Sequence, residues 1–212
     1  MVVAVMIRTL GRTGRRMWCR WPTRLAAVIV LPAEVVAAVR DLADGAPVIV
    51  IDGPAGAGKT STAAAIVALV APRSAAVIHM DDLYDGWSGL NDELTDYLTE
   101  ELEPQIRAGE DITHRCFDWH AGEFGASRRV PETDVLIVEG VGAGQPALAD
   151  VADLSIWVEA PRQICEQRWR DRDGAAMSAH MADWWVAQDS HFARYRTRER
   201  ADLTVHTAPG VR

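Results

Sequence analysis

The sequence is poor in lysine and cysteine and contains no long hydrophobic run. Of its 22 Lys and Arg residues only Lys59 is a lysine. The three cysteines, Cys19, Cys116 and Cys165, lie far apart, and no CxxC pair occurs. We therefore expect a reduced cytoplasmic protein without a disulfide framework or a cysteine-based metal site. No run of 18 apolar residues occurs, so we expect no transmembrane helix.

Charge is distributed unevenly along the chain. The formal net charge is -8, yet residues 1–24 hold six arginines and no acid, which leaves -14 on the rest. An acidic body argues against a broad nucleic-acid-binding face, so we expect no nucleic-acid partner. We interpret residues 1–24 as a flexible basic extension, although an interaction arm or a targeting segment would have a similar composition. Residues 25–212 should form one globular domain with a sizeable core.

Apolar runs alternate with segments of helical pattern through this domain. We expect helices over residues 32–44, 60–71, 91–109, 161–174 and 180–199, with Pro104 kinking or ending the third and Gly174 closing the fourth. Buried strands are predicted in "PVIVIDG", "AAVIHMD", "TDVLIVEG", "ADLSIWVEAP" and "ADLTVHT". This alternation predicts a three-layer α/β fold, with a five-stranded parallel sheet between helices on both faces. Ligands of such sheets bind beyond the carboxyl ends of the strands.

The most specific pattern lies in "VIVIDGPAGAGKTST", residues 48–62. Within it "GPAGAGKT" fits G-x-x-x-x-G-K-[ST] at every fixed position, after a predicted strand and before a predicted helix. Glycines allow positive φ angles and a close approach of backbone N–H groups to a phosphate chain. The helix then points its positive end at the phosphates. The pattern predicts an ATP site, with the nucleotide-binding residues Gly53, Ala55, Gly56, Ala57, Gly58, Lys59, Thr60 and Ser61.

Lys59 occupies the motif position that reaches the β- and γ-phosphates. A compact ammonium suits that task, whereas a planar guanidinium is larger and has the wrong shape. This explains why a chain that otherwise uses arginine keeps one lysine here, and it makes Lys59 a predicted catalytic residue. A second lysine would be needed for the N-K-x-D motif that guanine-specific GTPases commonly use, so the sequence excludes that class.

Asp81-Asp82-Leu83-Tyr84 resembles the D-[ST]-F-Y element that follows the second strand in the uridine kinase family. The G-x-x-G-x-G-K-[ST] form of the loop likewise resembles that of small-molecule and nucleoside or nucleotide kinases. The resemblance implies that Asp81 is the catalytic base and lies near Mg²⁺, and that Tyr84 lies near the acceptor. A hydroxyl that attacks a γ-phosphate needs a carboxylate to orient it and take its proton. Asp82 remains an alternative base.

Glu139 ends another predicted strand, in "DVLIVEG", and resembles the V-E-G segment of the same family. We expect Glu139 to hold Mg²⁺ opposite the Thr60 hydroxyl, directly or through water. The predicted metal residues are therefore Thr60, Asp81 and Glu139.

The predicted helix over 161–174 carries several arginines, at the place where related kinases have an arginine-bearing lid. Arg168 and Arg172 share a face, and the resemblance implies that they neutralise charge on the transferred phosphoryl group. They are predicted catalytic residues. Pairing with nearby acids on a solvated helix face is the alternative.

The segment "HRCFDWHAGEF" is the candidate acceptor region. Phe117-Asp118-Trp119 is similar to a Y-D-F segment of the uridine kinase family, with phenylalanine in place of tyrosine. Asp118 would accept hydrogen bonds from sugar hydroxyls, and Trp87 or Trp119 would stack on a ring. Tyr84, Trp87, Asp118 and Trp119 are the predicted substrate-binding residues.

Together these patterns predict that residues 25–212 form a P-loop kinase domain that transfers the γ-phosphate of MgATP to a small-molecule hydroxyl. A nucleoside is the leading acceptor. The alternatives are a nucleotide or other metabolite kinase and, from another class, an NTP-dependent switch that hydrolyses slowly.

Overall fold

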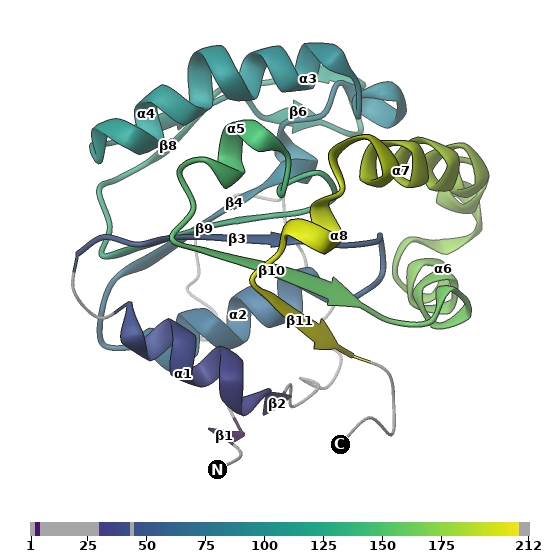
Figure 1. Ribbon diagram of the computed structural model, residues 1–212. Coiled ribbons are helices and arrows are strands. Elements are labelled where there is room, and N and C mark those ends of the chain that lie inside the picture. Colours follow the sequence, from purple (N-terminus) through teal and green to yellow (C-terminus); the bar gives the residue numbers. More distant parts are fainter. Residues whose placement is uncertain (1–2, 5–29, 43–44, 208–212) are drawn as a thin grey trace, which may run out of the picture.

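The computed structural model describes residues 3–4, 30–42 and 45–207 (Figure 1). The predicted basic extension falls outside these ranges except for β1 (Val3–Ala4), which pairs antiparallel with β2 (Val30–Leu31). No helix in the described ranges is long and apolar enough to cross a membrane.

A five-stranded sheet forms the centre of the molecule. Its strands lie in the order β11-β10-β3-β9-β4, and every neighbouring pair is parallel. The prediction of five parallel strands is confirmed. Their bounds are β3 (Val48–Asp52), β4 (Ala75–His79), β9 (Val135–Glu139), β10 (Leu154–Glu159) and β11 (Leu203–His206).

The neighbouring strands β3 and β9, both inside the sheet, are buried along their whole length, which explains their continuous apolar sequences. Every residue of β3 and of β9 is buried, as expected for a parallel sheet covered on both faces. Both strands nevertheless end in an acid, Asp52 and Glu139 respectively. Two buried carboxylates thus lie on neighbouring strands at the edge where ligands of such sheets bind.

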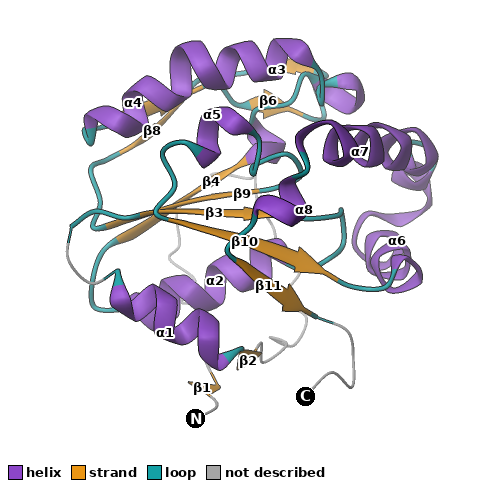
Figure 2. Cartoon of the chain, viewed as in Figure 1, coloured by secondary structure: helices purple, strands orange, loops and turns teal. Residues whose placement is uncertain are grey.

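Helices cover both faces of the sheet (Figures 1 and 2). On one side lie α1 (Ala33–Asp41) and α2 (Lys59–Val70), and on the other lie α5 (Pro146–Ala149), α7 (Met181–Tyr195) and α8 (Thr197–Arg200). The helix α6 (Arg162–Ser178) lies beyond the carboxyl end of β10, and with α7 it forms a helical hairpin. We call α6 and α7 the hairpin below.

A long helical segment, α3 (Asp92–Tyr97), η3 (Leu98–Leu102) and α4 (Glu103–Ala108), lies on the same side as α5. Asn91 caps it, since its side chain accepts a hydrogen bond from the Leu94 N–H at 3.0 Å. The helix does not end at Pro104. The turn before the proline is a π-helix, which accommodates a residue that has no N–H and crowds the preceding turn.

Two other helix predictions were wrong in their bounds. Gly174 does not close α6, which continues to Ser178. The predicted helix over 180–199 is two helices, because Arg196 adopts φ 51° between α7 and α8. A left-handed residue ends an α-helix, and the chain then starts a new one in another direction.

Short antiparallel pairs form an arm between α4 and β9. Two short 3₁₀ helices, η1 (Met80–Asp82) and η2 (Gly86–Ser88), follow β4; η1 contacts β6 of this arm and η2 contacts α7. The arm's strands are β5 (Ile112–His114), β6 (Phe117–Asp118), β7 (Glu123–Phe124) and β8 (Arg128–Val130), paired as β5–β8 and β6–β7.

Candidate active site

The phosphate loop runs from the end of β3 to the start of α2. The Asp52 carboxylate holds it in place through hydrogen bonds. This buried carboxylate accepts backbone hydrogen bonds from Gly53 at 2.7 Å, Gly142 at 2.8 Å and Gly144 at 3.0 Å. Burial raises the pKa of Asp52, while these donors and Lys59 oppose the rise. Asp52 therefore ties the loop to the segment that follows β9.

Two glycines of the loop are required by the chain packed against them. Gly53 and Gly56 have φ angles of 140° and 78°. A Cβ on Gly53 would meet the Val158 carbonyl, and one on Gly56 the Cys165 carbonyl, both closer than 3.0 Å. The loop thus needs glycine at these positions both for its backbone angles and for close approach to β10 and α6.

Lys59, the first residue of α2, folds back over the loop. Its Nζ donates hydrogen bonds to the carbonyl oxygens of Gly53 at 2.8 Å and Pro54 at 2.9 Å. Burial lowers the pKa of Lys59, while the nearby carboxylates, Glu139 first, oppose that shift. The ammonium is thus held by the backbone of the loop itself.

The Thr60 hydroxyl and Glu139 face each other across the sheet edge. Thr60 Oγ1 donates to Glu139 Oε1 at 2.9 Å, and His79 Nδ1 lies 2.6 Å from the same oxygen. Burial by itself raises the pKa of Glu139, but the contact with His79, the charge of Lys59 and the Thr60 hydrogen bond outweigh it and lower the pKa. Glu139 is therefore a buried, ionised acceptor beside the loop.

These groups fit Mg²⁺ of a nucleotide. Carboxylate and hydroxyl oxygens are ligands that Mg²⁺ prefers, and it usually keeps waters and substrate phosphates as its other ligands. Within the described residues no three His, Cys, Asp or Glu side chains form a metal cluster. The protein's share of a magnesium site would thus be small, with Thr60 and Glu139 beside phosphate oxygens.

Asp81 and Asp82 lie on the 3₁₀ turn η1, not on an extended strand end. The Asp82 carboxylate is paired with Arg128 at 2.7 Å and accepts from Cys116 Sγ at 3.5 Å. Among the described residues no hydrogen bond to the Asp81 carboxylate occurs, and the one from Trp119 goes to the Asp81 backbone carbonyl. The two carboxylates therefore point to different surroundings, as expected for adjacent residues of a 3₁₀ turn.

Asp81 is electrostatically part of the loop region. Surrounding protein raises its pKa, and the Glu139 carboxylate raises it further, while Arg172 and Lys59 lower it. Because Asp81 itself is exposed, water limits the effect of burial. Asp81 is thus a solvent-exposed carboxylate that interacts electrostatically with Lys59 and Glu139.

Arg168 differs from the lid arginine that the resemblance implies. Its guanidinium donates to the carbonyls of Gly56 and Ala57 at 3.2 Å each, and to Thr207 Oγ1 at 2.9 Å and Thr207 O at 2.6 Å. The Arg168 guanidinium is thus engaged by the backbone of the loop and by Thr207. Arg172, one turn later, is exposed and lies near enough to lower the pKa of Asp81.

Two predicted substrate residues are occupied by protein contacts. Tyr84 is 1% exposed, and its hydroxyl donates to the Val141 carbonyl at 2.7 Å. The Tyr84 side chain is therefore part of the core in this structure and is not accessible to an acceptor. Trp87 is surrounded by aromatic rings. It stacks on His180 with 4.8 Å between centroids, and it also contacts Trp119, Trp169 and Trp184.

The other two predicted substrate residues lie on the arm. Asp118 Oδ1 accepts the backbone N–H groups of His120 at 2.9 Å and Ala121 at 3.1 Å, which closes a turn. Trp119 Nε1 donates to the Asp81 carbonyl at 3.0 Å. Trp119 is thus the predicted substrate residue with a direct contact to the candidate base.

Three residues at the site were not predicted from the sequence: Asp52, His79 and Gln188. Asp52 and His79 are the last residues of β3 and β4, and a polar residue at the end of a strand is a sequence signal that could have found them. Gln188 carries no such signal, because its Oε1 accepts the N–H of Ala55, which is 133 residues away, at 3.1 Å.

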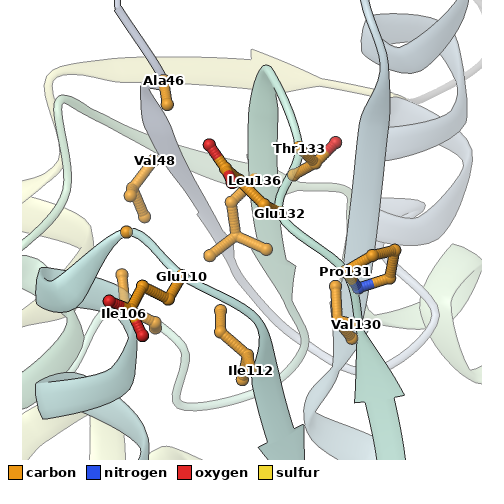
Figure 3. Close-up of a pocket in the computed structure, with 11 residues that line it drawn as sticks. Ala46, Val48, Ile106, Glu110, Ile112, Val130, Pro131, Glu132, Thr133 and Leu136 are labelled. Atoms are coloured by element: carbon orange, nitrogen blue, oxygen red, sulfur yellow. The ribbon is translucent and has the colours of Figure 1, made fainter.

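A shallow hollow, shown in Figure 3, lies elsewhere in the molecule. Val48 and Leu136 line it from the amino-terminal ends of β3 and β9, together with Ile106, Ile112 and Val130. The phosphate loop follows the opposite end of β3, so this hollow is not the nucleotide site.

The comparisons with known proteins agree with this architecture. The chain superposes with a TM-score of 0.57 on a possible uridine kinase from Bacillus stearothermophilus, covering 81% of this chain and 99% of the other at 21% identity. A candidate fructose transport system kinase from Silicibacter sp. gives 0.52, with 81% and 97% covered at 24% identity. No protein-family model and no curated protein match the sequence. The fold is that of the P-loop kinases and resembles that of uridine kinase.

Proposed function

We propose that this protein is an ATP-dependent kinase that transfers the γ-phosphate of MgATP to a hydroxyl of a small molecule, with nucleosides as the first candidates. The observation that carries the proposal is the juxtaposition at the loop. A complete phosphate-loop sequence places Thr60 2.9 Å from the Glu139 carboxylate, and Asp81 lies close enough for Glu139 and Lys59 to shift its pKa.

In this proposal Lys59 holds the phosphates. Its Nζ, now on two loop carbonyls, exchanges them for β- and γ-phosphate oxygens, which are stronger acceptors because they are charged. The backbone N–H groups of the loop and the start of α2 supply further donors. Mg²⁺, when bound with ATP beside Thr60 and Glu139, neutralises charge on the phosphates.

Asp81 is the proposed base. It orients the acceptor hydroxyl toward the γ-phosphate and takes its proton as the new P–O bond forms. The raised pKa of Asp81 suits this task, since a stronger base accepts a proton more readily. Arg172 faces the same region and would offset the negative charge there.

The acceptor enters between the arm and the hairpin in this proposal. Trp119 borders Asp81 on the arm side, and His180 at the start of α7 covers Trp87. Entry requires the hairpin to move away from the arm, as lids of kinases do when they open.

The test compares two neighbouring carboxylates. The acceptor is first sought by coupled ADP release over nucleosides, sugars and small antibiotics. With that acceptor, Asp81→Asn should lower kcat about 10²–10⁴-fold with ATP affinity little changed. Asp82→Asn should cost much less, because Asp82 is paired with Arg128. A normal kcat for Asp81→Asn would remove Asp81 as the base.

An NTP-dependent switch is the second candidate, and one observation favours it. Tyr84 is buried, Trp87 is enclosed by aromatic rings, and Asp118 caps its own turn, so three of the four residues expected to bind an acceptor are engaged by other parts of the protein. The two functions differ in the product: a switch releases inorganic phosphate only, whereas a kinase makes a phosphorylated acceptor.

A further inference from the structure

Gln188 on α7 contacts the phosphate loop, although nothing in its sequence surroundings suggests a role. Its side chain is fully buried. The Oε1 atom accepts the backbone N–H of Ala55 at 3.1 Å, and Nε2 lies 3.5 Å from Asp189 Oδ1. A buried glutamine is uncommon unless its amide has partners. Here the partner is the third residue of the loop.

The other helix of the hairpin binds the next two residues of the loop. Arg168 on α6 donates to the carbonyls of Gly56 and Ala57 at 3.2 Å, and the Cys165 backbone packs directly against Gly56. The hairpin thus supplies an acceptor for one loop N–H and a donor for two loop carbonyls. These contacts give hydrogen-bond partners to three backbone groups of the loop.

The first part of α7 contacts the aromatic residues that follow β4, on the proposed acceptor side of the site. His180, at the start of α7, stacks on Trp87, and Trp184 contacts both Trp87 and Tyr84. His180 and Gln188 are separated by eight residues, which is about 12 Å along a helix. One rigid helix therefore joins the phosphate loop to the aromatic cluster beside the candidate base.

We infer that Gln188 is a positioning residue: it holds the Ala55 region of the loop in its phosphate-binding shape and couples that shape to the placement of the hairpin. The inference rests on the proposed function only in taking the loop to bind ATP. Without the Gln188 acceptor, the Ala55 N–H loses its partner and the loop has to be ordered by the nucleotide itself. Part of the free energy of ATP binding is then needed to order the loop, so the affinity for ATP falls.

The experiment measures ATP affinity by titration calorimetry in the full chain. Gln188→Met keeps the length of the side chain and removes the acceptor, and we expect Kd for MgATP to rise about tenfold, which is the size of one unpaired buried donor. Gln167→Met makes the same change on the exposed side of α6, where the amide bonds only to Asp171, and should leave Kd within twofold.

Two further measurements separate positioning from a general loss of structure. Once an acceptor is known, Gln188→Met should raise KM for ATP more than it lowers kcat, while its thermal unfolding midpoint stays within a few degrees of that of Gln167→Met. In the unmodified chain without nucleotide, the Ala55 amide should be protected from hydrogen exchange. This second measurement does not depend on how any variant folds.

Equal Kd values for the two variants, or an unprotected Ala55 amide, would overturn the role of Gln188. Failure of the unmodified chain to bind MgATP would instead overturn the proposed function, so the two failures are distinguishable.

Discussion

Replacing Gly56 by alanine tests the geometry of the phosphate loop with a single methyl group. At this position φ is 78°, and the left-handed region costs a residue with a Cβ roughly 1–2 kcal/mol. The new Cβ would also lie closer than 3.0 Å to the carbonyl of Cys165. Carbon and carbonyl oxygen normally stay about 3.3–3.6 Å apart, so the loop and α6 have to separate by roughly 1 Å.

That displacement is enough to disturb the neighbouring contacts. Arg168 reaches the Gly56 and Ala57 carbonyls at 3.2 Å, and a shift of this size takes both beyond hydrogen-bonding range. Each lost hydrogen bond is worth about 1 kcal/mol, and about 1.4 kcal/mol is tenfold in Kd. We therefore expect Gly56→Ala to lose about 1–3 kcal/mol of unfolding free energy, and to raise Kd for MgATP about tenfold or more.

The assay pairs urea unfolding with ATP titration, and Gly109→Ala is its matched control. Gly109 follows α4 with φ 69°, but a Cβ there has no other atom within 4 Å. Gly109→Ala should therefore cost about 1 kcal/mol of stability through its backbone angle and leave ATP binding unchanged. If Gly56→Ala bound ATP as well as Gly109→Ala does, the close packing of α6 on the loop would be refuted as a requirement for binding.

Three further predictions concern the side chains of Glu139, His191 and Asn91. Glu139→Gln should raise the Mg²⁺ concentration for half-maximal activity more than it weakens ATP binding, because a neutral amide holds Mg²⁺ less well; an unchanged Mg²⁺ titration would leave Glu139 a structural role. Burial lowers the pKa of His191 to about 4, below its unfolded value of about 6.5. The unfolded chain then binds more protons between these values, so stability falls as pH drops from 7 to 5, by about 2 kcal/mol; His191→Leu should lose that share of the slope in urea titrations, and an identical slope would contradict the shift. Asn91→Ala should cost about 1 kcal/mol through the lost cap on α3, checked by the same urea titrations; no loss would mean that the cap is replaced by water.

The parallel sheet and the phosphate loop could be predicted because local sequence determines them. Every residue of β3 and β9 is apolar except the last, which identifies buried parallel strands. The loop requires particular backbone angles and close packing, so its glycines are visible in the sequence, as Gly53 and Gly56 show.

The remaining features depend on contacts between distant residues. Spacing along α6 shows that Arg168 and Arg172 share a face, but not that Arg168 binds loop carbonyls 111 and 112 residues away. Tyr84 was expected at the acceptor, and only the fold shows that Val141 occupies its hydroxyl. The break at Arg196 was missed because a non-glycine residue rarely adopts a left-handed backbone.

The most direct test of the central claim follows the γ-phosphate itself. The chain is incubated with γ-³²P-labelled ATP, Mg²⁺ and the pool of nucleosides, sugars and antibiotics, and the products are separated. The account predicts label in a phosphorylated small molecule, lost in Lys59→Ala because the ammonium now on the Gly53 and Pro54 carbonyls is the group that holds the phosphates. Label found only in inorganic phosphate, or full transfer by a folded Lys59→Ala protein, would contradict it.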